Sequence, residues 1–231
     1  MLKIISLSFV LMASSPTIEN FRHQITSNQP TVETAFQTPT LLMVTSAALQ
    51  HSSITEAERK YLLDFMMKTK ERLLKDVKGL TPAQLNFKPD SSRWSVAECV
   101  EHITITENSN MNRVTEGLKT DADASKRSQI TMKDEDILKR YSDRSNKRKT
   151  GEALEPKSRF GSHEGALKEF MEKRDVNIDF VKTTKEDLRN RTTTYSFGTI
   201  DLYQCILALT AHSERHILQL EEVMTHPRFP K

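Results

Sequence analysis

Apolar residues recur every three or four positions in four long stretches of this chain, and this spacing predicts four amphipathic helices. The predicted helices cover Thr55 to Gly79, Ser95 to about Leu118, His163 to Arg189 and Gly198 to Thr225. The last is the most regular, because one of its faces carries Leu202, Ile206, Leu209, Leu220 and Val223. Four such segments in one region predict an all-α four-helix bundle.

Local signals mark where these helices start. The segments Thr55–Glu58 and Ser95–Glu98 both have the pattern of a capping box, in which a hydroxyl and a carboxylate satisfy free backbone amides. For the last helix, Thr199 is the expected N-cap, with Asp201 in the first turn near the positive helix end. The residues 189–198 before it are rich in threonine and prone to extended structure.

A polar excursion over residues 119–162 separates the second helix from the third. It is heavily charged, with a short helix expected over residues 128–141 and many basic residues between Arg140 and Lys149. Two interpretations stay open for this basic run. It is either a solvated connection between helices or a rim that binds phosphate or acidic groups.

Residues 1–54 differ from the predicted domain at 55–231. Residues 1–15 have one lysine, a short apolar run and then small residues, which is the outline of a secretory signal peptide. Residues 17–50 are polar without a sustained helical period, which predicts a disordered tail. We expect a cytoplasmic protein. Export through the signal peptide is the alternative, and a start codon assigned too far upstream, before Met43, is a third reading of this region.

Composition excludes some function classes. The 231 residues include 34 basic and 31 acidic side chains, and a net charge of only +3 makes no strong case for binding nucleic acid, for which a concentrated basic patch is expected. No stretch approaches the roughly 18–20 apolar residues of a membrane-spanning helix. Cys99 and Cys205 are expected to be free buried thiols, although their positions three and seven residues before candidate histidines leave a redox or ligand role open.

Two histidines stand out on the last predicted helix. His212 and His216 are four residues apart, a spacing that stacks their side chains one turn apart and allows both to bind one ion. This spacing is also a common coincidence. The residue after His212 is Ser213, where zinc proteases of the HExxH type have glutamate, so a metalloprotease is not expected.

Two motifs resemble those of the DinB-like family of bacterial proteins. The segment Trp94–His102 is similar to its WSxxExxxH opening of the second helix, and His212–Gln219 is similar to its HxxRHxxQ stretch. The resemblance extends from about Thr55 to the C-terminus. It implies a four-helix bundle, often paired as a homodimer, in which His102, His212 and His216 hold a divalent metal ion such as zinc or nickel.

Three neutral imidazoles leave at least one coordination position open. Glu98 and Gln219 are the expected partners of the second ring nitrogens, with helix capping and interhelical hydrogen bonding as their alternative roles. The family resemblance implies a metal-dependent hydrolase or thiol S-transferase acting on a small-molecule substrate, such as a low-molecular-weight thiol. The alternative is a non-catalytic, stress-associated binding protein with a structural metal; no catalytic residue is assigned.

Overall fold

Four long helices form the body of the described chain, as the hydrophobic spacing predicts. The structure, a computed structural model, describes residues 54–145 and 149–231. The long helices are α1 (Glu56–Val77), α3 (Val96–Leu118), α5 (His163–Thr183) and α6 (Leu202–Met224). The proposed signal peptide and the tail up to residue 53 lie outside the described residues, and the division at residue 55 stays a prediction.

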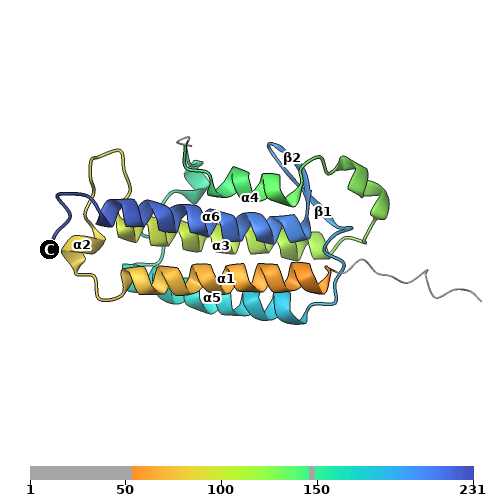
Figure 1. Cartoon of the computed structure of the whole chain (residues 1–231), viewed down its shortest axis with the longest axis horizontal. Helices are drawn as coiled ribbons and strands as arrows, with labels where there is room; N and C mark the ends of the chain where they lie inside the picture. The colour runs from red at the N-terminus through yellow and green to blue at the C-terminus, as the bar shows by residue number, and fades with distance from the viewer. Residues whose placement is uncertain (1–53, 146–148) are drawn as a thin grey trace, which may run out of the picture. The chain divides into compact units, whose positions relative to one another are not determined.

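The long helices pack as an all-α four-helix bundle. Helix α3 packs against α5 and α6, and α1 packs against the same two helices. Figure 1 shows that α3 and α5 run in one direction while α1 and α6 run in the other. Because α3 and α6 are antiparallel neighbours, the first turns of α3 lie beside the second half of α6. This arrangement brings His102 towards His212 and His216.

Both predicted capping boxes are confirmed. The Thr55 hydroxyl accepts from the Glu58 amide, and the Glu58 carboxylate accepts from the Thr55 amide at 2.6 Å. Ser95 and Glu98 exchange the same pair of bonds at the start of α3, with the Ser95 amide 2.8 Å from Glu98 Oε2. These bonds satisfy amides that have no partner within their own helix.

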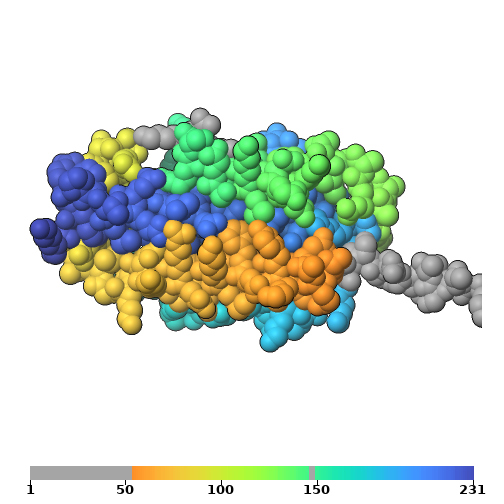
Figure 2. All heavy atoms as spheres, in the orientation of Figure 1, coloured from red at the N-terminus to blue at the C-terminus, as the bar shows by residue number. Residues whose placement is uncertain are grey.

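The polar excursion between α3 and α5 carries the chain back along the bundle to the end at which α3 begins. After α3 come the 3₁₀ helix η2 (Ala124–Gln129), helix α4 (Asp134–Ser142) and the 3₁₀ helix η3 (Glu152–Leu154). The short helix expected over residues 128–141 therefore begins later, at Asp134. Helix α4 packs on α6, and the space-filling view shows its atoms seated against those of α6 (Figure 2). Since α5 must start at the same end as α3, this crossover is required by the topology.

The connection from α5 to α6 differs from the prediction. Helix α5 ends at Thr183 instead of Arg189, because the backbone leaves the helical conformation at Thr184. Further on, the Asp187 carboxylate accepts from the Arg189 and Asn190 amides and holds a turn. A hairpin of β1 (Thr192–Tyr195) and β2 (Gly198–Asp201) follows, with Thr192 opposite Asp201. Residues 198–201 thus pair as a strand, and α6 begins only at Leu202.

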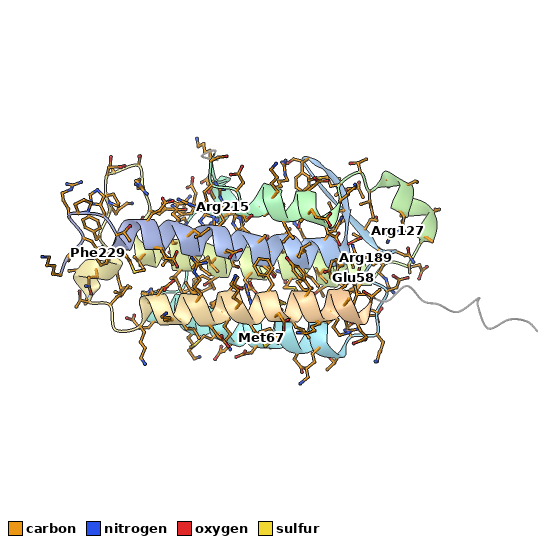
Figure 3. The ribbon with its side chains drawn as sticks, in the orientation of Figure 1. Glu58, Met67, Arg127, Arg189, Arg215 and Phe229 are labelled. Carbon is orange, nitrogen blue, oxygen red and sulfur yellow. The ribbon has the colours of Figure 1, made fainter. Side chains whose placement is uncertain are left out.

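The N-cap of α6 is Asp201, so the assignment of Thr199 was wrong. The Asp201 carboxylate accepts from the Gln204 amide at 2.7 Å, whereas Thr199 lies in β2. Asp201 also pairs with Arg189, whose guanidinium contacts Glu58 of α1 and Asp134 of α4 as well. Figure 3 shows Arg189 and Glu58 together at this end of the bundle. One arginine therefore ties three helix starts together.

Replacing Asp201 by alanine is expected to lower the free energy of unfolding by about 1–2 kcal/mol, the usual effect of losing an N-cap. Asp201→Asn should retain most of this capping energy, because an amide oxygen also caps. Thr199→Ala serves as the control and should change stability little. Urea denaturation measures all three, and a larger loss in Thr199→Ala than in Asp201→Ala would contradict the assignment.

A buried ion pair occupies the centre of the bundle. Arg174 of α5 and Glu107 of α3 meet at 2.6 Å, and neither side chain is exposed to solvent. The five N–H groups of Arg174 all have acceptors: two on the Glu107 carboxylate, two on Met66 and Thr69 of α1, and one on Ser213 of α6. This network connects all four long helices.

No helix in the described part of the chain is both long enough and apolar enough to cross a membrane.

Candidate metal centre

Three imidazoles converge between α3 and α6. His102 lies in the second turn of α3, and His212 and His216 lie one turn apart on α6. Each ring offers a nitrogen within 4.8 Å of those of the other two. The ring centroids are 4.4 Å apart for His102 and His216 and 4.5 Å apart for His212 and His216. The structure thus brings together the three residues that the sequence singled out.

Hydrogen bonds fix the orientation of two of these rings. His102 Nδ1 lies 2.8 Å from the Leu154 carbonyl oxygen, and His216 Nδ1 lies 2.9 Å from Gln219 Oε1. Both partners are oxygens that accept, so each Nδ1 donates its proton and each Nε2 keeps a lone pair. His102 Nε2 faces His212 Nε2 at 2.9 Å. Since His102 Nε2 holds a lone pair, His212 Nε2 donates the proton of this contact in the metal-free chain, and a bound ion would replace that proton.

Arg144 supports the orientation of Gln219. Its Nη1 lies 3.4 Å from Gln219 Oε1, and its guanidinium also forms a bidentate pair with Glu222. A guanidinium only donates hydrogen bonds, so the amide must turn its oxygen towards both Arg144 and His216. Arg144 belongs to the basic run of the excursion, part of which lies outside the described residues. The rim interpretation of that run stays a prediction.

Burial keeps two of the imidazoles, those of His102 and His216, neutral. Burial lowers the pKa of His102 to about 4 from its ordinary value of 6.5, against a smaller raising effect of the Leu154 carbonyl. The pKa of His216 falls well below 6.5, first because of burial and then because His212 and His102 are close. A neutral imidazole is the form that binds a metal ion. These rings are therefore in the ligating form at neutral pH.

Aromatic side chains line the group. The Trp94 ring lies 4.7 Å from His102 and stacks on His216 at 5.6 Å, between centroids. Tyr141 of α4 meets His212 edge to face at 6.1 Å. Trp94 belongs to the motif noted in the sequence, whereas Tyr141 was not singled out. The excursion thus supplies part of the wall around the candidate site.

The outcome for the expected ring partners is mixed. Gln219 contacts His216, as predicted. Glu98 does not orient His102, because its carboxylate is engaged with the Ser95 amide and with Lys88. The partner of His102 is instead the Leu154 carbonyl. A backbone carbonyl brought in from 52 residues away leaves no mark in the sequence, so this contact could not be predicted.

The two cysteines are free and buried, and neither belongs to the group of histidines. Cys99 packs in the apolar cluster around Phe170 and Ile217, and burial raises its pKa. Cys205 packs with the cluster at the other end of the bundle, and burial raises its pKa to about 11. Thiols with raised pKa values are poor nucleophiles, which agrees with a packing role.

Comparisons with known proteins agree with the motifs. The sequence pattern that defines the DinB superfamily matches residues 66–220. An uncharacterized protein of Bacillus subtilis strain 168, YuaE, is 27% identical over 149 residues, which cover 64% of this chain and 88% of that protein. YfiT from Bacillus subtilis has a solved structure, described as a probable metal-dependent hydrolase with an unusual four-helix bundle topology. It is 18% identical with a TM-score of 0.49, over 74% of this chain and 89% of that one.

Proposed function

This chain belongs to the DinB superfamily, and from that premise and the geometry of the imidazoles we propose that it is a metal-dependent enzyme. His102, His212 and His216 are the proposed ligands of one divalent ion, zinc or nickel. The observation that supports the proposal is the convergence of the three rings within 4.8 Å, with Nδ1 of two rings engaged elsewhere. This donor set fits a divalent ion of borderline softness.

The chemistry of such a site follows from its ligand count. An ion with three imidazole ligands and an open position would polarise a substrate carbonyl or acidify a water or thiol. The protein's own contribution is orientation: Leu154 and Gln219 hold the Nδ1 protons, so that Nε2 of each ring faces inward. Trp94 packs against the rings of His102 and His216 on one side.

We propose a small molecule as the substrate, either one with a hydrolysable bond or an electrophile attacked by a low-molecular-weight thiol. The test incubates metal-loaded protein with a panel of esters and amides and, separately, with thiols and electrophiles. Turnover that disappears in His212→Ala supports the proposal. Equal turnover in the variant would show that the activity does not come from these histidines.

Metal binding itself can be followed through Trp94, the single tryptophan of the chain. Its ring lies 4.7 Å from that of His102, so a bound paramagnetic ion such as Co²⁺ or Ni²⁺ is expected to quench its fluorescence strongly. His212→Ala should abolish the saturable quenching without removing a ring that Trp94 stacks on. His226→Ala removes a histidine outside the group and should quench like wild type. Equal quenching in both variants would contradict the ligand assignment.

A second candidate is a structural ion in a non-catalytic binding protein. It is favoured by the burial of His102 and His216, which are only 2% and 6% exposed. Removing the ion with a chelator distinguishes this structural role from the catalytic one. A large fall in melting temperature together with inertness in every assay favours the structural role, whereas turnover by the loaded protein excludes it.

A further inference from the structure

The carboxylate of Glu101 occupies an anion-binding turn of the backbone. Glu101, next to His102 in α3, accepts hydrogen bonds from three consecutive amides. Arg159 N lies 2.7 Å and Lys157 N 3.1 Å from its Oε1, and Ser158 N lies 3.1 Å from its Oε2. Ser158 has a φ of +57°, a left-handed conformation. Successive amides in such a turn form a concave site for a negative charge, and here that charge comes from the protein itself.

The same loop also contacts the candidate metal centre. Leu154, three residues before Lys157, ends η3 and places its carbonyl 2.8 Å from His102 Nδ1. Two neighbouring residues of α3 therefore hold one loop at two points. Glu101 binds the backbone amides of residues 157–159, and His102 binds the backbone carbonyl of Leu154. Glu101 is only 8% exposed, so its three charge-assisted bonds are shielded from solvent.

We propose that Glu101 is a positioning residue for His102. By fixing the turn at residues 157–159, it keeps the Leu154 carbonyl against His102 Nδ1 and so directs Nε2 towards the other two imidazoles. The role of Nε2 as a ligand rests on the proposed function, whereas the dependence of the His102 tautomer on Glu101 does not. Without the carbonyl, neutral His102 is free to carry its proton on Nε2, and that form has no lone pair at the centre.

The contacts explain why glutamine cannot replace Glu101. A glutamine has one accepting oxygen, and its amide group would place N–H donors against the N–H groups of the turn. At least one of the three backbone amides then loses its partner inside a mostly buried site. The loop is expected to move away from α3, and the Leu154 carbonyl moves with it.

The experiment measures the His102 tautomer and the metal affinity separately in the full chain. Long-range ¹H–¹⁵N spectra of the metal-free protein report which ring nitrogen carries the proton. We expect Nδ1–H in wild type and a mixture of both tautomers in Glu101→Gln. Competition with a chromogenic zinc chelator should show a dissociation constant about tenfold higher in the variant, the lower end of the range for loss of a ligand's hydrogen-bond partner.

Ser158 offers a matched pair of variants that leaves the carboxylate intact. Its side chain is exposed, so substitutions there do not disturb the core. Ser158→Val should reproduce the effects of Glu101→Gln, because a β-branched residue strongly disfavours positive φ, whereas Ser158→Gly should behave like wild type. Glu155→Gln removes an ion pair to the Lys157 side chain without touching the turn, and it controls for loss of surface charge.

The outcomes separate this inference from the proposed function. If Glu101→Gln and Ser158→Val both keep His102 entirely in the Nδ1–H form and bind zinc like wild type, the positioning role is wrong. If wild type binds no zinc while the variants still shift the tautomer, the positioning role stands and the metal site falls. If one variant loses its helical circular dichroism, the tautomer and zinc affinity of the other variant decide the test. The two substitutions change opposite sides of the same contact, the carboxylate and the turn.

Discussion

Replacing Arg174 by methionine is expected to lower the free energy of unfolding by about 3–5 kcal/mol, the largest change that we predict for a single substitution. The variant leaves the Glu107 carboxylate buried with one remaining hydrogen bond, from Asn177. Thr69 loses the donor that Arg174 supplies to its hydroxyl, and so does Ser213. An uncompensated charge in the bundle centre is costly because the Glu107 side chain is fully shielded from solvent.

Denaturation with guanidinium chloride, followed by circular dichroism, measures the effect. Asp175→Asn is the matched control, because Asp175 also links α5 to α1 through Lys70 but is 60% exposed. A surface pair of this kind contributes about 0–1 kcal/mol. The double variant Arg174→Met with Glu107→Leu should recover much of the lost stability, since it removes both charges. A loss in Arg174→Met no larger than in Asp175→Asn would contradict the central role of this ion pair.

Acid is expected to destabilise the metal-free protein through His102. Its pKa is about 4 in the folded chain, against an ordinary value of 6.5. Between these values the unfolded chain binds the proton and the folded chain does not. Stability from this group is therefore fully present above about pH 6.5 and is lost as the pH falls towards 4. The difference corresponds to ~3 kcal/mol, and the low pKa of His216 acts in the same direction.

Urea denaturation between about pH 7 and pH 4, with a chelator present, measures this dependence. His102→Phe keeps an aromatic ring beside Trp94 but cannot be protonated, so its stability should fall less over the same range. Burial raises the pKa of Asp201 to about 6, so this group stabilises the folded chain as the pH falls, opposite to His102. Its effect is the same in wild type and His102→Phe and cancels in the comparison. Identical pH profiles for wild type and His102→Phe would contradict the buried, neutral state of this histidine.

The sequence was sufficient for the long helices and for most of their starts. Apolar spacing and two capping boxes located α1 and α3 to within a residue or two, because both signals are local. The family motifs selected the three histidines before any distance was known. What joins His102 to His212 and His216 in space is the antiparallel packing of α3 and α6 (Figure 1); the resemblance implied that the three histidines share one ion but not how these helices run.

Contacts between distant parts of the chain were not predictable in the same way. Between α5 and α6, the turn at Asp187 and the β-hairpin occupy residues that the helical pattern had assigned to the end of α5 and the start of α6. Arg174 and Asn177 were missed because only apolar residues were counted as core. Both lie on the helix face of Phe170 and Val181, and this spacing was the available signal for buried polar groups. The Leu154 carbonyl and the Glu101 turn depend on the folded path of the excursion.

The most direct test of the ligand assignment is the metal content of the purified protein, measured by elemental analysis beside His216→Ala. His216 lies 4.4 Å from His102 and 4.5 Å from His212, between ring centroids, so its loss leaves two ligands from different helices. We predict about one zinc or nickel ion per chain in wild type, as for a three-histidine site, and a content near zero in the variant. An unchanged metal content in His216→Ala would show that the ion is bound elsewhere.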